Sequence, residues 1–288
     1  MRRDVEAPRL IVFGSTGYIG QAVVAAASAA LPVTGTVARS SSMLRACLRD
    51  APPGAVVVHA AGTVSCPDDA PDLRAYVDST KRLFDAMADV GAPLRVLTLG
   101  SIAETLQVTG AYATAKRAQQ AVAREASERL GIPWRHLLIH NVIGPDLHAT
   151  LAPGALVRQL RHVVAAGGRT LSIRNGAAVR DYLDVRDLAT LIVSLSHCFD
   201  ELDRDRPVEV CSGIGRSVHD IAAALVATSG AAIDVVEPPG SDDISRVVGD
   251  PAPLRTVLGP AAGMTIDFGT SITDLWESSV RFASRETT

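Results

Sequence analysis

The sequence lacks the features that mark nucleic-acid-binding or membrane proteins. Its formal net charge is only −3, so it has no strongly basic character of the kind that binds nucleic acid or anionic membranes. No run reaches the roughly 18 apolar residues of a membrane-spanning helix. The start, Met1–Asp4, has no apolar core of a signal peptide. We therefore expect a cytoplasmic protein with neither nucleic acid nor membrane as a partner.

Cysteine is also scarce, and its spacing is uninformative. The four cysteines form no CxxC pair and no Cys/His ligand pattern. We interpret them as reduced thiols and predict no metal site; they are Cys47, Cys66, Cys198 and Cys211.

Apolar residues, by contrast, are plentiful. They make up 47% of the 288 residues, and charged residues make up 20%, which suits one large α/β domain with a full core. Short apolar strands alternate with helical patterns along the first half of the chain, which predicts a parallel, doubly wound sheet. The expected strands are 10–13, 33–38, 55–59, 94–99 and 134–139, and the expected helices are 21–30, 43–48, 73–90 and one from near Tyr112 to 130.

The pattern loosens after Asn141, where glycine, proline and polar residues become frequent. A helix at 155–165 and short strands at 208–211 and 234–237 with a helix at 218–229 suit a small substrate-covering lobe. A strand at 182–185 and a helix at 188–195 are predicted to return to the main sheet. The expected division is a Rossmann-type NAD(P)-binding domain, 1–141 plus 176–205, and a substrate-binding lobe, 142–175 plus 206–288.

A glycine-rich turn follows the first strand and opens the first helix, the context typical of dinucleotide binding. Gly14 permits the tight turn, Gly17 lets the backbone approach the pyrophosphate, and Gly20 allows close packing of helix on strand. The helix N-terminus then faces the phosphates with free N–H groups. The predicted cofactor-binding turn is Gly14, Ser15, Thr16, Gly17, Tyr18, Ile19 and Gly20.

The end of the second strand indicates which dinucleotide is preferred. A carboxylate there would hold the ribose hydroxyls of NAD, but this chain has Arg39 and Ser40 instead. The arginine fork and the serine hydroxyl suit a 2′-phosphate. We predict NADP(H) over NAD(H).

Tyr112 and Lys116 form the most informative pair of residues. They are separated by four positions on a predicted helix, so both side chains lie on one face. A free tyrosine titrates near pH ~10, and a nearby ammonium favours the phenolate, so the phenol can exchange a proton with a substrate oxygen. Ser101 ends the preceding strand, and its hydroxyl can hold the same oxygen. We predict Ser101, Tyr112 and Lys116 as catalytic residues of hydride transfer to a carbonyl.

These motifs together resemble the extended short-chain dehydrogenase/reductase family, the NAD(P)-dependent sugar-nucleotide epimerases and dehydratases. The later motifs resemble reductases of GDP-4-keto-6-deoxymannose and related 4-keto-deoxysugar nucleotides most. The motifs are 14–20, 59–62, 100–101, Tyr112/Lys116, 141–145, 180–187, 212–213 and 249–259.

The resemblance implies roles for particular residues. Lys116 would also bond the nicotinamide ribose, and Asn141 and Arg180 would contact the pyrophosphate of a nucleotide sugar, since a guanidinium fork pairs two phosphate oxygens. An alternative for Arg180 is an ion pair with Asp181 or Asp184. The remaining implied cofactor contacts are Ala60, Ala61, Gly62 and His140, and a homodimer is expected.

The departures from the family pattern select the reaction. Tyr76 replaces an asparagine, and the chain between Arg39 and His59 is too short for the usual third strand. Ile102 and Ala103 follow Ser101 where a dehydratase would have Asp-Glu, so net NADPH-dependent reduction at C4 in deoxysugar biosynthesis is favoured. A 4-epimerase, a general carbonyl or hydroxysteroid-type reductase and a non-catalytic NAD(P) sensor are the alternatives.

Overall fold

The computed structural model describes residues 9–28, 33–36, 40–62, 73–107, 110–238, 245–259 and 264–283. The chain divides into two compact units. Unit 1 comprises 1–139, 188–210 and 252–262, and unit 2 comprises 140–187, 211–251 and 263–288. Within the described residues no helix has both the length and the apolar character needed to cross a membrane.

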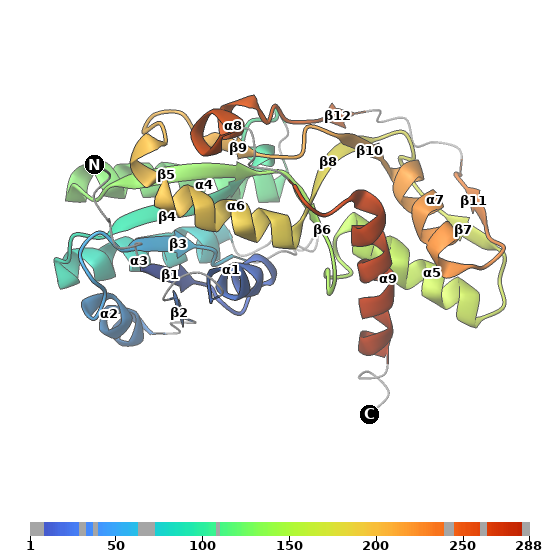
Figure 1. The fold of residues 1–288 in the computed structure, drawn as a ribbon, viewed down its shortest axis with the longest axis horizontal. Coiled ribbons are helices and arrows are strands. Elements are labelled where there is room, and N and C mark those ends of the chain that lie inside the picture. Colours follow the sequence, from blue (N-terminus) through green and yellow to red (C-terminus); the bar gives the residue numbers. More distant parts are fainter. Residues whose placement is uncertain are drawn as a thin grey trace. The chain divides into compact units, whose positions relative to one another are not determined.

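Unit 1 contains a six-stranded, fully parallel sheet (Figure 1). The two strands on which the order reverses, β1 and β3, are fully buried and rich in Val, Ile and Leu, as expected for strands covered on both faces. The spatial order is β2 (Val33–Thr36), β1 (Leu10–Phe13), β3 (Val56–His59), β4 (Arg95–Ser101), β5 (Trp134–Ile139) and β9 (Val208–Val210).

Helices connect these strands and build the core with them. α3 (Leu73–Val90) packs between α2 (Ser41–Arg49) and α4 (Ala111–Leu130). Alternate strand residues such as Ile11 and Val57 join Phe84 of α3 in one buried cluster, because successive side chains of a strand point to opposite faces. The other helices of this unit are α1 (Tyr18–Ser28), α6 (Val185–His197, which starts in unit 2), α8 (Ala252–Leu258) and the short η1 (Ile102–Glu104) and η2 (Phe199–Glu201).

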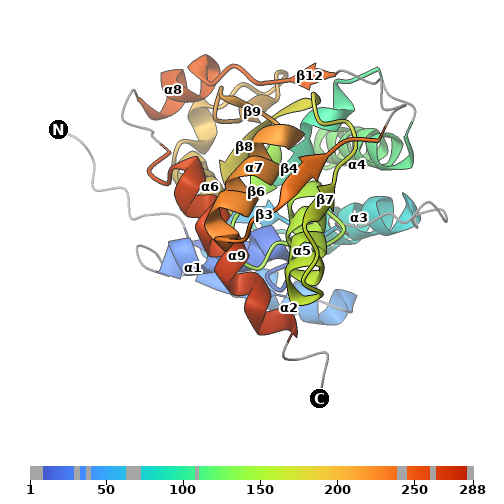
Figure 2. The ribbon, with the colours of Figure 1, turned by 90° about the vertical axis from the view of Figure 1, so that its right-hand side faces the viewer.

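Unit 2 is built from short strands and three packed helices (Figure 2). The strands of its larger sheet are β6 (Asn141–Ile143), β8 (Val179–Asp184), β10 (Gly215–Ser217) and β12 (Arg246–Val247), and β7 (Thr170–Ser172) pairs with β11 (Asp234–Val236). The helices are α5 (Ala152–Ala165), α7 (Val218–Ser229) and α9 (Phe268–Ala283).

Buried carboxylates hold the loops of unit 2 together. Asp181 is fully buried and accepts hydrogen bonds from the backbone N–H groups of Ser212, Gly213 and Gly249. Asp187 accepts in the same way from the segment that precedes α9, at Thr265 and Ile266. Hydrogen bonds to ionised groups contribute about 1.5–3 kcal/mol each, so these carboxylates stabilise segments with little apolar area.

Two expectations about strands are wrong. The strand predicted at 182–185 does not return to the main sheet: β8 pairs with β6, β10 and β12 in unit 2. The strand predicted at 208–211 for the lobe is instead β9, the outermost partner of β5 in the main sheet. Both strands mix apolar and charged residues, and the identity of the neighbouring strand depends on contacts distant in sequence. The expected loss of a third strand agrees with the fold, because no described strand lies beyond β2.

Candidate active site

The turn after β1 has the geometry of a dinucleotide cradle. Gly14 has a φ of +96°, and a Cβ there would lie 2.5 Å from the backbone N of Ala61. A Cβ at Gly20 would overlap the carbonyl oxygen of Gly14, whereas a Cβ at Gly17 would meet only that oxygen, at 3.4 Å. Gly14 and Gly20 are thus required by close backbone packing. At Gly17 the fold itself leaves room for a side chain. Glycine at this position therefore suits the close approach of a ligand to the backbone.

The cradle lies where the strand order reverses. β1 pairs with both β2 and β3, and ligands of open α/β sheets bind at such a switch point, beyond the carboxyl ends of the strands. Ala60, Ala61 and Gly62 follow β3 at this edge, and the backbone N of Ala60 bonds to Phe13 O at 2.8 Å. The N-terminus of α1, from Tyr18 and Ile19, opens at the same turn, after Ser15 and the exposed Thr16. These residues fit a dinucleotide phosphate.

The structure describes only one of the two residues predicted to select the cofactor. Arg39 lies outside the described residues. Ser40 is the N-cap of α2, and its hydroxyl accepts a hydrogen bond from the backbone N–H of Met43 at 3.3 Å.

Tyr112 and Lys116 lie one turn apart on α4 in contrasting environments. The Tyr112 side chain is 36% exposed, whereas Lys116 is 8% exposed. The Lys116 Nζ donates at 3.0 Å to Leu99 O and at 3.0 Å to Gln119 Oε1. Leu99 is two residues before Ser101 on β4, so this bond ties the lysine to the strand that carries the serine.

Burial shifts the pKa of two groups near this end of the sheet. Desolvation lowers the pKa of Lys116 to about 8, and the negative charge of Glu104 opposes the shift. Desolvation, assisted by the charge of Lys116, lowers the pKa of His59 to about 3. At neutral pH, Lys116 is therefore largely charged and His59, which bonds to Thr80 Oγ1 at 3.1 Å, is neutral.

Ser101 is held by a buried polar network that the sequence did not reveal. Its hydroxyl accepts from the backbone N–H of Ala103 at 3.2 Å, and its own N–H donates to Glu104 Oε1 at 2.7 Å. Glu104 Oε2 lies 2.9 Å from His136 Nε2, and His136 Nδ1 lies 2.6 Å from Thr98 Oγ1. A hydroxyl that accepts one bond still has a donor to offer, so Ser101 can hold a substrate oxygen.

Gly100 makes room for this network. A Cβ at Gly100 would overlap both the His136 ring and the Glu104 carboxylate. The family pattern ends at Gly100-Ser101, and nothing in the sequence linked Glu104 to His136, which lies on the neighbouring strand. Only the pairing of β4 with β5 brings them together.

The predicted pyrophosphate contacts, Asn141 and Arg180, both belong to unit 2. Asn141 begins β6, and its partner in the ladder with β8 is Tyr182. The Arg180 guanidinium donates to Ser245 O at 3.0 Å and to Ser245 Oγ at 2.8 Å. The alternative in which Arg180 pairs with Asp181 or Asp184 finds no support among the described residues. The Asp181 carboxylate binds loop N–H groups, and the Asp184 carboxylate binds Arg186.

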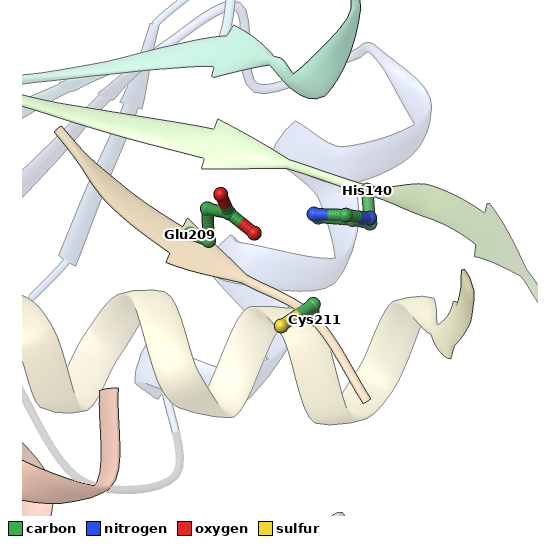
Figure 3. Close-up of side chains that lie close together, drawn as sticks. All are labelled: His140, Glu209 and Cys211. Carbon is green, nitrogen blue, oxygen red and sulfur yellow. The ribbon is translucent and has the colours of Figure 1, made fainter. Parts of the chain in front are cut away.

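His140 is buried directly after β5. Figure 3 shows it with Glu209 and Cys211, side chains of types that ligate metals. His140 and Cys211 belong to unit 2 and Glu209 to unit 1, so we assign no metal site to these residues. Gly249 lies against the first two, because a Cβ there would be 2.7 Å from His140 Nε2 and 2.6 Å from Cys211 Sγ.

The chain is similar in sequence to proteins of one known family. A family model described as "NAD dependent epimerase/dehydratase family" matches residues 10–211. A GDP-6-deoxy-D-talose 4-dehydrogenase of Aggregatibacter actinomycetemcomitans is 31% identical over 94 residues, which are 32% of this chain and 31% of that protein. A dTDP-6-deoxy-L-talose 4-dehydrogenase (NAD(P)(+)) of Kitasatospora kifunensis is 26% identical over 203 residues, 65% of this chain and 62% of that protein. The matches thus span less than two thirds of either relative.

Solved structures share the fold. The structure of RMD from Pseudomonas aeruginosa complexed with NADPH has a TM-score of 0.80 at 22% identity and covers 96% of this chain and 99% of its own. A UDP-glucose 4-epimerase of Thermotoga maritima with UDP-glucose has a TM-score of 0.76 at 17% identity and covers 96% and 99%. Likenesses at this identity establish the fold, a Rossmann-like α/β architecture, as predicted from the sequence.

Proposed function

The chain belongs to the NAD dependent epimerase/dehydratase family, and from that premise we propose that it is an NADPH-dependent reductase of a nucleoside-diphosphate 4-keto-6-deoxyhexose. The match to the family model confirms the family predicted from the sequence. It also confirms the predicted class, the NAD(P)-dependent oxidoreductases of the extended short-chain dehydrogenase/reductase type. Support for the sugar comes from two relatives named as 4-dehydrogenases of 6-deoxytalose nucleotides. A 4-dehydrogenase and a C4 ketoreductase catalyse one reaction in opposite directions.

The observation that carries the proposal is the arrangement of Tyr112 and Lys116. Tyr112 is accessible to a ligand, while Lys116 is buried one turn away and tied to the strand that ends at Ser101. A bound dinucleotide would supply the hydride to C4. Tyr112 would donate its phenolic proton to the C4 oxygen, and the Ser101 hydroxyl would hold that oxygen. The charge on Lys116 stabilises the phenolate that remains on Tyr112.

Reduction is favoured over dehydration because Glu104 is unsuitable as a substrate base. Its side chain is 3% exposed, and the carboxylate accepts a bond from the Ser101 N–H and is hydrogen-bonded to His136. An acid–base group must reach the proton that it moves. The sole carboxylate in the segment just after Ser101 is thus bound to other groups of the protein and does not face a substrate.

The preference for NADPH rests on residue type at the end of β2. Arg39 offers a guanidinium where a carboxylate would select NAD. The Ser40 hydroxyl accepts a bond from Met43 and also lies 3.0 Å from Ser42 Oγ, so we assign the 2′-phosphate chiefly to Arg39. Solved relatives include complexes with NADPH and with NAD.

We assign the pyrophosphate of the sugar nucleotide to Arg180 and Asn141. The Arg180 guanidinium is half-buried and donates to Ser245, and a guanidinium has five N–H donors in all. Anchoring a group far from C4 lets remote binding energy position the reacting carbon.

The test measures NADPH oxidation with GDP- and dTDP-linked 4-keto-6-deoxyhexoses, together with calorimetry of UDP, GDP and TDP. We expect turnover with at least one sugar nucleotide and binding of its nucleoside diphosphate. Arg180→Ala should weaken that binding at least tenfold while the affinity for NADPH stays within about twofold, since a charge-assisted contact contributes about 1.5–3 kcal/mol. Arg174→Ala, an exposed arginine of the same unit, is the control.

Three outcomes would contradict the proposal. Efficient reduction of small ketones without nucleoside-diphosphate binding indicates a general carbonyl reductase. Interconversion of C4 epimers with a cofactor that stays bound through purification indicates an epimerase. Cofactor binding without turnover of any of these substrates indicates a sensor.

A further inference from the structure

Tyr76 of α3 lies at the centre of contacts that join three segments of unit 1. Its side chain is 1% exposed. It occupies the position at which the family pattern has an asparagine. We infer that Tyr76 is a positioning residue of the proposed reductase site: its ring carries the Lys116 ammonium on one face and meets the Tyr112 ring. This inference rests on the proposed function and deepens it.

The ring contacts both members of the catalytic pair. Lys116 Nζ lies 4.9 Å from the centroid of the Tyr76 ring, within cation–π distance. The Tyr112 ring lies 6.4 Å away, centroid to centroid, at 77° to the Tyr76 ring, the edge-to-face arrangement that aromatic pairs favour. One buried side chain therefore constrains the accessible tyrosine and the buried lysine together.

Gly62 provides the space for this ring. A Cβ at Gly62 would lie 2.8 Å from Tyr76 Cε1, closer than any real Cβ contact. An asparagine at position 76 would be shorter and would offer hydrogen bonds in place of a π face. The aromatic residue thus gives the ammonium a different kind of partner.

The surroundings of Lys116 explain why this partner matters. Its Nζ donates to Leu99 O and Gln119 Oε1, and the Tyr76 ring lies against the same ammonium. The charged group that acts on it is Glu104, after β4. The nearby His59 is neutral, because burial and the charge of Lys116 lower its pKa to about 3. Burial favours the uncharged amine, whereas Glu104 and the π face favour the ammonium. Removing the ring should therefore lower the pKa of Lys116 below about 8.

The sequence makes this effect directly measurable, because Lys81 and Lys116 are its only lysines. Lysine labelled with ¹³C and ¹⁵N gives two side-chain signals by NMR, and Lys81→Arg assigns them. In the ligand-free protein, Tyr76→Leu should lower the midpoint of the Lys116 titration by about one pH unit. Tyr76→Phe, which keeps the ring, should leave the midpoint within about 0.3 unit, a small part of that effect. The basic limb of the kcat/KM profile should move with the NMR midpoint.

A second substitution series guards against a variant that does not fold. Phenylalanine and 3,4,5-trifluorophenylalanine at position 76 have nearly the same shape, but fluorine withdraws electrons from the ring face. The Lys116 midpoint should fall with fluorination if the π face holds the ammonium. Equal midpoints in this pair, or a Tyr76→Leu midpoint equal to wild type, would overturn the inference.

The NMR titration needs no substrate, so it separates this inference from the proposed function. A fall in the midpoint supports the role of the ring even where no sugar nucleotide is reduced, which would count against the proposed reaction alone. If the enzyme is an active reductase but the midpoint of the Lys116 titration is unchanged by substitution of Tyr76, the inference is refuted and the proposed reaction is still supported.

Discussion

Replacing Gly17 by alanine should separate cofactor binding from folding. A Cβ at Gly17 meets no atom of the fold closer than Gly14 O at 3.4 Å, and its φ lies outside the left-handed region. The change should cost about 1 kcal/mol or less of folding stability, the cost of a weaker helix N-cap. If the pyrophosphate packs against this backbone, the added methyl should cost about 1–3 kcal/mol of binding, as overpacking does. NADPH affinity should then fall roughly 5- to 150-fold.

The assay titrates NADPH by its fluorescence and measures unfolding in urea on the same samples. Gly20→Ala is the matched comparison, because its Cβ would overlap Gly14 O; it should lose about 1–3 kcal/mol or more of stability. Wild-type NADPH affinity in Gly17→Ala would refute the reasoning. Equal destabilisation by the two substitutions would show that the turn is packed differently.

Four further outcomes are expected. Tyr112→Phe should keep NADPH affinity and lose about 10²–10⁴-fold in kcat, the usual contribution of a general acid; a rate within about threefold of wild type would place the proton donor elsewhere. Arg39→Ala should reduce the preference for NADPH over NADH in steady-state kinetics, and equal use of both by the wild type would contradict the assignment. His59 has a folded-state pKa near 3, below its usual 6.5, so the unfolded state binds the extra proton first. Stability should fall as pH drops from about 6.5 toward 3, by up to about 1.4 kcal/mol per pH unit, and urea unfolding of His59→Gln should show a shallower dependence. Glu104→Gln should lower the free energy of unfolding by about 1.5–3 kcal/mol in the same assay, because it removes a buried carboxylate that is hydrogen-bonded to the Ser101 N–H and to His136. An unchanged unfolding midpoint would show that the network is not stabilising.

The sequence by itself determined the α/β class, the family and several of the helices and strands. The helix at 73–90, the strand at 134–139 and the helix at 218–229 have the bounds that were predicted. These segments are long or strongly periodic, so local pattern decides them. The glycine turn was equally readable, because the spacing of its glycines reflects backbone contacts within a few residues.

Only the tertiary structure decided what depends on partners distant in the chain. It assigned β8 and β9 to their sheets, and short strands such as β6 and β10 and the helix Phe268–Ala283 were not predicted at all. It also brought Glu104 to His136 and Tyr76 to Lys116. A lone glutamate or tyrosine carries no periodic signal, and its role follows from burial and from the neighbours that strand pairing and helix packing supply. The sequence predicts which residues react, whereas the groups packed around them became visible only in the fold.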